Sequence, residues 1–387
     1  MPRIFFHIVL QIKKRQVYFL YTENTLVRVA KRENNTKRSY LVLNQLQGKH
    51  MASDPMETLA MFDQLAQLLA EAYRGKRVLI VGFAETATAI GSRLAIKMDS
   101  LYMQTTREKI EGVEYLYFTE SHSHAVEQKL IQTDLDQIID EIDHIIFAED
   151  EVTTGNTILK IVELIRQTYS KKVNFSAACL LNGMDEQAQQ RYRDKEICLY
   201  YLVKTNHSLY PKLVENYPTD GSYLWNYSEV KLPPIKQWEI TGYVDGRRLQ
   251  KGSVYAQACQ NLWEQLQTKI DVTGRESVLV IGTEEFMYPA IYVAGKIREK
   301  GGRVKTHSTT RSPMVVSRDE VCPLHCRYEL RSLYEKERKT YIYDIGCYDK
   351  VLILTDAREG SEVGLDDLCR AVVSKGNRDI QVIRWIE

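Results

Sequence analysis

The sequence has almost no excess of charge of either sign and no long apolar run. Its 387 residues carry 52 basic and 51 acidic side chains, for a net charge of +1. This balance gives no support to binding of nucleic acid or of an anionic membrane, and we expect neither as a partner. The apolar stretch at residues 4–12 is too short to span a membrane, and no small-residue cleavage site follows it.

Cysteines are few and odd in number. The seven are scattered mostly through apolar runs, at positions 179, 198, 259, 322, 326, 347 and 369. Such a set favours a reducing compartment where thiols pack as small apolar groups, so we expect a cytoplasmic protein. The segment from Cys322 to Cys326 also holds a histidine, but no second ligand pair at zinc spacing accompanies it.

The length favours two domains, and the pattern favours an α/β fold. Apolar strands alternate with helices over residues 78–203, which predicts a parallel sheet covered by helices. Residues 1–50 are rich in strand-forming residues, with a strand pair expected at 4–22. A helix is expected to begin at Asp54–Pro55 and to end at Gly75. Residues 207–245 lose the alternation, and we interpret them as a linker.

The alternating pattern restarts after this segment and repeats the first half. Residues 78–95 are echoed at 278–295, residues 102–108 at 306–312, and residues 144–150 at 350–356. Three matches in the same order predict two diverged copies of one fold. The alternative is a chance likeness between short apolar strands.

One segment in the first copy carries recognisable chemistry. The apolar run 145–148 ends in Glu149 and Asp150, and a small hydroxyl-rich loop between strand and helix follows, composed of Thr153, Thr154, Gly155, Asn156 and Thr157. Backbone N–H groups at a helix N-terminus, with threonine hydroxyls, suit a phosphate. Adjacent carboxylates suit a ligand that also carries hydroxyls or a hydrated divalent cation. The pattern predicts a site for ribose 5-phosphate.

This segment resembles the phosphoribosyl-diphosphate signature of the type I phosphoribosyltransferases, with Asn156 as the departure. The resemblance implies that family's fold, a parallel sheet with flanking helices, followed here by a second, degenerate α/β domain of similar fold. It implies that Glu149 and Asp150 are the catalytic residues, that residues 153–157 bind the 5-phosphate, and that Mg²⁺ is bound through phosphoribosyl diphosphate, Glu149 and Asp150.

Two further segments stand where this family binds and covers the diphosphate. The resemblance assigns diphosphate binding to Gly82, Phe83, Ala84, Glu85 and Thr86, with Arg107 and Lys109 as sources of positive charge. Glu85 departs from the family, which often has a basic residue in this loop. The resemblance also places a hood loop at 118–125 with His122 and His124. The alternatives are a solvated strand end at Arg107 and an inert loop around the histidines.

The chain more specifically resembles a bacterial two-part family in which a phosphoribosyltransferase precedes a domain named for Thr-Arg-Ser-Pro. That tetrapeptide stands at 310–313, and the upstream segment 36–50 ends in Gly-Lys-His, as in that family. The family is associated with tellurium-resistance-type stress operons and with a nucleoside-like metabolite. The expected domains are residues 1–206 for the transferase, 207–245 for the linker and 246–387 for the TRSP-type domain.

The second copy has lost most of the signature. It keeps Asp356 but has Thr355 in place of the other acid and no Thr-Thr-Gly-x-Thr. We therefore do not expect it to hold ribose 5-phosphate in the same way. Its candidate functional residues are Arg247, Arg248, Arg311 and Asp356, and the alternative for the arginines is a solvated surface.

The leading functional hypothesis is Mg²⁺-dependent transfer of the 5-phosphoribosyl group from phosphoribosyl diphosphate to a base-like nitrogen acceptor, with release of pyrophosphate. The small-molecule substrates are the expected partners, and a homodimer is a candidate assembly. One alternative is a non-catalytic regulator that binds the same ligand. Another is a phosphorylase or hydrolase of a ribosylated compound.

Overall fold

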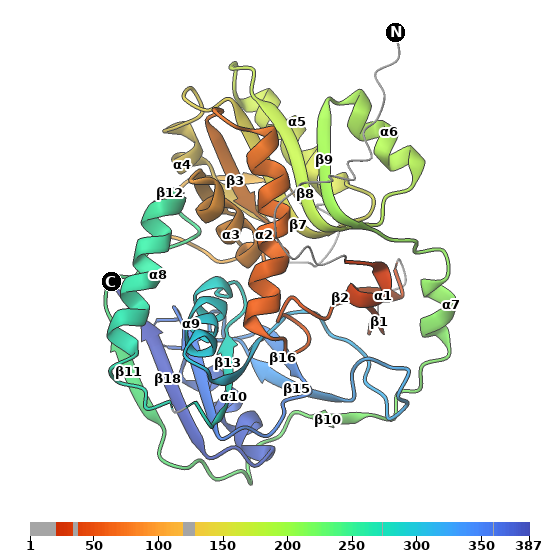
Figure 1. Cartoon of the computed structure of the whole chain (residues 1–387). Helices are drawn as coiled ribbons and strands as arrows, with labels where there is room; N and C mark the ends of the chain where they lie inside the picture. Colours follow the sequence, from red (N-terminus) through yellow and green to blue (C-terminus); the bar gives the residue numbers. More distant parts are fainter. Residues whose placement is uncertain (1–20, 34–37, 119–127, 273, 359) are drawn as a thin grey trace.

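The computed structural model describes residues 21–33, 38–118, 128–272, 274–358 and 360–387. It consists of two α/β units, which lie one above the other in Figure 1 with helices between them. The expected strand pair at 4–22 falls outside the described residues except for Tyr21 and Thr22. The expected hood histidines, His122 and His124, also lie outside them.

The first unit is built on one sheet whose apolar strands are largely buried, as expected for a parallel sheet covered on both faces. Its strands lie in the order β12 (Gln250–Lys251), β4 (Leu101–Gln104), β3 (Val78–Gly82), β7 (His144–Val152), β8 (Asn174–Asn182) and β9 (Ile197–Lys204). The strands from β4 to β9 run parallel, and β12 is antiparallel to β4.

The helices of the first unit include one whose start the sequence predicts and which ends at Ala72, three residues before the expected Gly75. They are α2 (Pro55–Ala72), α3 (Thr88–Met98), α4 (Gln132–Asp136), α5 (Asn156–Thr168) and α6 (Glu186–Asp194). The Asp54 side chain accepts a hydrogen bond from the N–H of Met56, and Pro55 holds the first helical position, so the predicted start of α2 is confirmed.

The second unit repeats part of the strand order of the first. Its sheet runs β11 (Lys236–Ile240), β18 (Asp379–Trp385), β17 (Lys350–Thr355), β13 (Ser277–Gly282) and β14 (Arg303–Ser308), all parallel. Four strands of this second sheet, β14, β13, β17 and β18, repeat the order of β4, β3, β7 and β8 in the first. Its helices are α8 (Gly252–Leu266), α9 (Tyr288–Glu299) and α10 (Glu362–Ser374). The three sequence echoes fall on equivalent strands, β3 with β13, β4 with β14 and β7 with β17, so the predicted second α/β domain of similar fold is confirmed.

The segment expected to be a linker contributes regular structure. It holds α7 (Tyr210–Glu215), β10 (Ser222–Leu224) and β11, and β11 pairs with β18 inside the second sheet. The second sheet therefore takes a strand from before residue 246, where we expected that domain to start. Sequence alternation missed this strand because it lies at a sheet edge and leaves most of its side chains exposed.

Short elements complete the chain and tie its N-terminal part to the second unit. They are α1 (Glu23–Leu26), the hairpin β1 (Val27–Lys31) and β2 (Tyr40–Asn44), the pair β5 (Tyr115–Tyr117) and β6 (Lys129–Ile131), and strands β15 (Cys326–Arg331) and β16 (Lys339–Tyr343) beside β10. The N–H of Val315 donates to the carbonyl of Lys31 at 2.9 Å. Ala30, Leu43 and Met314 share one buried apolar cluster.

Each unit pairs with an edge strand of the other unit's sheet. Strand β12, just before α8 of the second unit, pairs with Leu101 and Tyr102 at the edge of the first sheet. Ser53, just before α2 of the first unit, pairs with Thr306 of β14 at the edge of the second sheet through two hydrogen bonds of 3.0 and 2.9 Å. One edge strand of each sheet is thus paired over part of its length by the other unit, which satisfies backbone groups that would otherwise be exposed.

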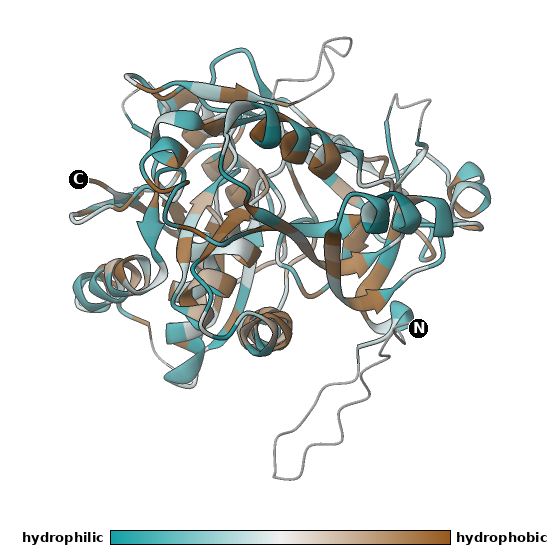
Figure 2. Ribbon diagram, turned by 90° about the horizontal axis from the view of Figure 1, so that it is seen from above, coloured by the Kyte–Doolittle hydropathy of each residue, from teal (hydrophilic) through white to brown (hydrophobic). Residues whose placement is uncertain are grey.

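Apolar packing is continuous across the interface. One buried cluster contains Leu65 and Leu94 of the first unit together with Leu262 and Ile291 of the second. Figure 2 shows hydrophobic ribbon concentrated on the inner strands and hydrophilic ribbon on many outer helices and loops.

In the part of the chain that the structure describes, no helix has both the length and the apolarity to span a membrane. All seven cysteines lie in this part and are free thiols.

The close packing of α8 on α3 predicts a sensitive glycine. A Cβ on Gly252 would lie 2.3 Å from the carbonyl oxygen of Ala95, which is backbone and cannot move cheaply. We expect Gly252→Ala to cost roughly 1–3 kcal/mol through overpacking and to lower the melting temperature measurably by calorimetry. Gly274→Ala is the matched control, because the nearest atom to its Cβ would lie 3.8 Å away. Equal melting temperatures for the two variants would contradict the packing argument.

Candidate functional site

The loop at residues 153–157 joins the carboxyl end of β7 to the N-terminus of α5. Gly155 adopts a left-handed φ of 68°, and a Cβ there would lie 2.5 Å from both Met184 Cε and Tyr192 Cε1. The Tyr192 hydroxyl donates to the carbonyl of Gly155 at 3.2 Å, and Arg191 donates to the carbonyl of Thr154 at 3.0 Å. The loop is therefore held from behind by α6, and its front is open to a ligand.

Glu149 and Asp150 lie half-buried at the end of β7, immediately before this loop. Burial raises the pKa of Glu149 well above its usual range, and the charge of Asp150 raises it further. Burial also raises the pKa of Asp150, although hydrogen bonds from the Thr86 side chain and the Glu151 backbone lower it. Two adjacent acids that are costly to ionise form a site that a cation or hydroxyl donors would stabilise.

This donor set fits Mg²⁺ held partly by a ligand. Among the described residues, no group of three or more His, Cys, Asp or Glu side chains could hold a metal ion by itself. Two carboxylates with no third protein ligand among the described residues match the preference of Mg²⁺ for substrate phosphates over an all-protein cage. The pair therefore fits the ion that the sequence resemblance implies.

The 82–86 loop follows β3. Its side chains point partly into the core of the first unit and partly into the second unit. Phe83 is 1 % exposed and packs against Phe118 and Phe147 in the core. The N–H of Ala84 donates to Thr105 Oγ1 at 2.8 Å. The carboxylate of Glu85 points into the second unit, where it is 5 % exposed. The departure at Glu85 is thus a contact between units, and the side chain does not face the 153–157 loop.

Positive charge near this loop comes from Arg107. Within the described ranges its guanidinium has no hydrogen bond or ion pair, and its Nε is buried. Burial lowers the pKa of Arg107, and the charge of Arg311 lowers it further. Lys109 is exposed and lies on the wall of a cavity of about 870 Å³ between the two units. Among the described residues of this region, Arg107 is accordingly a partly buried cation whose guanidinium is free to meet an anion.

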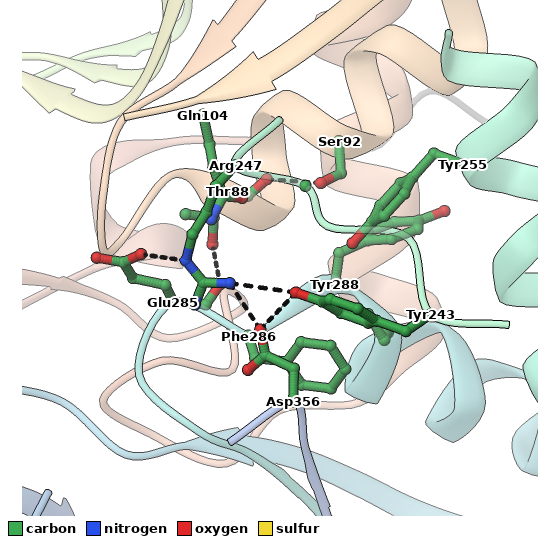
Figure 3. Close-up of a pocket in the computed structure, with 12 residues that line it drawn as sticks. Thr88, Ser92, Gln104, Tyr243, Arg247, Tyr255, Glu285, Phe286, Tyr288 and Asp356 are labelled. Atoms are coloured by element: carbon green, nitrogen blue, oxygen red, sulfur yellow. Dashed lines mark hydrogen bonds and ion pairs between the residues drawn. The ribbon is translucent and has the colours of Figure 1, made fainter. Parts of the chain in front are cut away.

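The equivalent site in the second unit is filled by the protein's own side chains. Figure 3 shows the guanidinium of Arg247 lying between Glu285 and Asp356. Arg247 donates to Asp356 at 2.6 Å and to Glu285 at 3.1 Å, and the hydroxyls of Tyr243 and Tyr334 also donate to Asp356 at 2.7 and 2.6 Å. The space that remains there is about 10 Å³, too small for a sugar.

The other two candidates in the second unit are also occupied. Arg248 makes a bidentate pair with Asp134 of α4 at 2.7 and 2.8 Å. Arg311 pairs with four carboxylates, those of Glu85, Glu108, Glu284 and Glu285. The structure thus brings Arg247, Arg248, Arg311 and Asp356 to the boundary between units, and each is engaged in protein contacts.

A cluster that sequence reasoning missed lies beside the signature. Glu151 Oε2 accepts from Arg38 at 2.7 Å, and Glu151 Oε1 lies 3.2 Å from Nε2 of His207. Burial raises the pKa of Glu151 to about 7, against the charge of Arg38, which lowers it. Burial lowers the pKa of His207 to about 4, so its ring is neutral at pH 7. A third acid directly after the signature pair was the available signal.

His207 also borders an open cavity next to the 153–157 loop. The cavity has a volume of about 670 Å³ and is bounded by Thr153, Thr154, Met184, Asn206 and His207, among others. The Tyr40 hydroxyl lies 3.0 Å from Nδ1 of His207, so the N-terminal hairpin contributes to the same wall. A ligand held by the loop would have beside it a space large enough for a planar ring.

The buried acid predicts a pH effect on stability. An acid whose pKa rises on folding, from an ordinary 4.5 to about 7, binds its proton more tightly in the folded chain. The folded state therefore loses stability as pH rises through this window. We expect the melting temperature of wild type to fall relative to that of Glu151→Gln between pH 5 and pH 8. The exposed variant Glu163→Gln should show no such trend, and parallel curves for wild type and Glu151→Gln would refute the assignment.

Comparison with known proteins identifies the parts of the chain. Residues 26–208 match the family model described as phosphoribosyl transferase, and residues 246–371 match the model for the TRSP domain that lies C-terminal to that transferase. A search of curated proteins finds no match.

Several solved structures are similar to the chain. Adenine phosphoribosyltransferase from Rhodothermus marinus is 14% identical, with 47% of this chain and 96% of that chain covered and a TM-score of 0.35. The enzyme from Giardia lamblia, complexed with 9-deazaadenine, is 16% identical, with 48% and 96% covered and a TM-score of 0.35. A hypoxanthine phosphoribosyltransferase from Staphylococcus aureus is 22% identical, with 38% and 72% covered and a TM-score of 0.25.

The two family models together account for both units, and the signature loop and its acids lie in the first of them. The chain therefore belongs to the family of phosphoribosyltransferases in which a TRSP domain follows the transferase domain.

Proposed function

We propose that the protein transfers the 5-phosphoribosyl group of phosphoribosyl diphosphate to a base-like nitrogen acceptor, with Mg²⁺ and with release of pyrophosphate. The observation that carries this proposal is the pairing of two half-buried acids, Glu149 and Asp150, with an anion-binding loop held open at the N-terminus of α5.

The proposed roles follow from charge and position. Backbone N–H groups and hydroxyls of the 153–157 loop bind the 5-phosphate at the helix N-terminus. Glu149 and Asp150 accept hydrogen bonds from the ribose hydroxyls. Arg107, whose guanidinium has no hydrogen bond or ion pair within the described residues, binds the diphosphate. Mg²⁺, held by the two acids and the ligand, would neutralise charge on the leaving group.

The reaction needs little covalent chemistry from the protein. The bond between ribose C1 and the diphosphate oxygen breaks, the acceptor nitrogen forms the new bond to C1, and the acceptor's displaced proton passes to solvent. Positive charge develops on the sugar as pyrophosphate departs. The carboxylates of Glu149 and Asp150 stabilise that charge, and tight positioning of the two reactants supplies much of the remaining rate.

The cavity of about 670 Å³ beside the loop is the proposed place for the acceptor. Thr153 and Thr154 belong to both the loop and the cavity wall, so an acceptor there would lie next to bound ribose 5-phosphate. Asn206 lies on the cavity wall, and its side-chain amide would recognise the edge of a planar nitrogenous ring. His207 would form part of the wall, because both of its ring nitrogens are engaged by protein groups.

The acids give the sharpest test. The double variant Glu149→Gln, Asp150→Asn should keep its melting temperature, because it removes two acids that are costly to ionise, and should lose activity by about 100-fold or more. The measurement is pyrophosphate release over a panel of nitrogenous bases, beside calorimetric titration with phosphoribosyl diphosphate and Mg²⁺. The exposed pair Glu163→Gln, Asp194→Asn is the control.

The outcomes separate the candidate functions. Release that depends on Glu149 and Asp150 supports a transferase. Tight binding without release from any base would favour a regulator. Failure of wild type to bind phosphoribosyl diphosphate would overturn the proposal.

A further inference from the structure

A carboxylate from the transferase domain is bound by the tetrapeptide that gives the TRSP domain its name. Glu85 Oε1 accepts from the hydroxyl of Thr310 at 2.7 Å and from the N–H of Arg311 at 2.9 Å. The guanidinium of Arg311 lies 3.6 Å from Glu85 Oε2, and the ammonium of Lys49 lies 3.5 Å from Oε1. Glu85 is part of the 82–86 loop, which stands in the proposed diphosphate site.

A matching contact runs in the opposite direction, from a glutamate of the TRSP domain to a Thr-Arg pair of the transferase domain. Glu285 accepts from the hydroxyl of Thr106 at 2.8 Å and from the N–H of Arg107 at 2.9 Å. Glu85 and Glu285 follow equivalent strands, β3 and β13, and the two Thr-Arg pairs follow β4 and β14. Each domain thus inserts one glutamate into the Thr-Arg pair of the other, and we call this reciprocal contact the exchange.

The two halves of this exchange differ in whether the arginine side chain is paired with carboxylates. Arg311 pairs with four carboxylates, whereas the guanidinium of its equivalent, Arg107, has no partner in the described parts of the chain. From this Thr-Arg pair, Glu285 accepts from the backbone N–H of Arg107 and the hydroxyl of Thr106, and among the described residues it makes no hydrogen bond or ion pair with the Arg107 guanidinium. The exchange therefore fixes the backbone at Arg107 and leaves its side chain available.

The charge of Glu85 is neutralised within the interface. Burial opposes its ionisation, but Lys49, Arg311 and the bonds from Thr310 and the Arg311 backbone lower the pKa of Glu85 to about 2. Lys49 is itself held by the carbonyls of Glu284 and Thr309, each at 2.8 Å. A glutamate in the proposed diphosphate loop consequently points away from the ligand with its charge compensated.

We propose that the TRSP domain acts as a tethered partner that fixes the diphosphate-binding segments of the transferase domain. Thr310 and Arg311 are positioning residues that hold the 82–86 loop through Glu85, and Glu285 is a positioning residue that holds Arg107 through its backbone. The inference rests on the proposed function, because it assigns these segments to the diphosphate of the same ligand. The 5-phosphate loop at 153–157 lies outside the exchange.

The test compares two ligands that differ in the diphosphate. Calorimetry with Mg²⁺ measures phosphoribosyl diphosphate and ribose 5-phosphate on full-length wild type, Thr310→Val and Thr310→Ser. Thr310→Val keeps the shape but removes the hydroxyl that donates to Glu85, and it should weaken phosphoribosyl diphosphate binding roughly tenfold, the order expected when a buried charged acceptor loses a donor. Ribose 5-phosphate should bind as to wild type, and Thr310→Ser should restore the lost affinity.

Two further variants test whether any loss of affinity in Thr310→Val comes only from a general loss of stability. Arg298→Ala removes another contact between the domains, the ion pair with Asp54, and should leave both affinities unchanged. If Thr310→Val melts well below wild type, Glu85→Gln removes the same charged contact from the other side, and the same difference between the two ligands is expected.

The results decide between the claims. Wild-type affinity for phosphoribosyl diphosphate in Thr310→Val and Glu85→Gln would overturn the inference and leave the proposed function standing. Equal weakening of both ligands would also overturn it, because a clamp on the diphosphate segments cannot act on the 5-phosphate loop. Failure of wild type to bind phosphoribosyl diphosphate would overturn both.

Discussion

The reciprocal burial of Glu85 and Glu285 is the interaction on which the arrangement of the two domains depends. Each carboxylate is at most 5 % exposed and lies in the other domain. A buried charge without partners costs several kcal/mol, on the order of 3–5 kcal/mol when one partner is removed. The Thr-Arg pairs can satisfy these charges only when the domains are docked in one orientation, so electrostatics selects the docking geometry while apolar packing supplies most of its stability.

The two domains treat their signature acids in opposite ways. In the TRSP domain, Arg247, Tyr243 and Tyr334 satisfy the remaining signature acid, Asp356, and close the site. In the transferase domain, Glu149 and Asp150 keep raised pKa values. One copy pairs its acid with an arginine, and the other keeps two acids that have no ion-pair partner among the described residues, an arrangement that costs stability.

The N-terminal hairpin connects this architecture to the open side of the site. Its strand β1 bonds to the TRSP domain near Val315, and Tyr40 of β2 reaches His207 at the wall of the cavity. The third acid, Glu151, is paired with Arg38 from the same part of the chain. The cavity wall is therefore assembled from segments far apart in the sequence, and its shape depends on the contact between domains.

Local features could be predicted from the sequence alone, because they depend on neighbours along the chain. The Asp54 cap, the strand–loop–helix at residues 145–168 and the duplicated strands of the two sheets follow from periodicity, turn chemistry and capping. Tertiary structure alone decided which partner each charged side chain meets. The direction of Glu85, the closure of the second site by Arg247 and the entry of β11 into the second sheet all depend on groups more than a hundred residues away. Contacts at that separation leave no periodic signal, since they are set by how two finished units pack against each other.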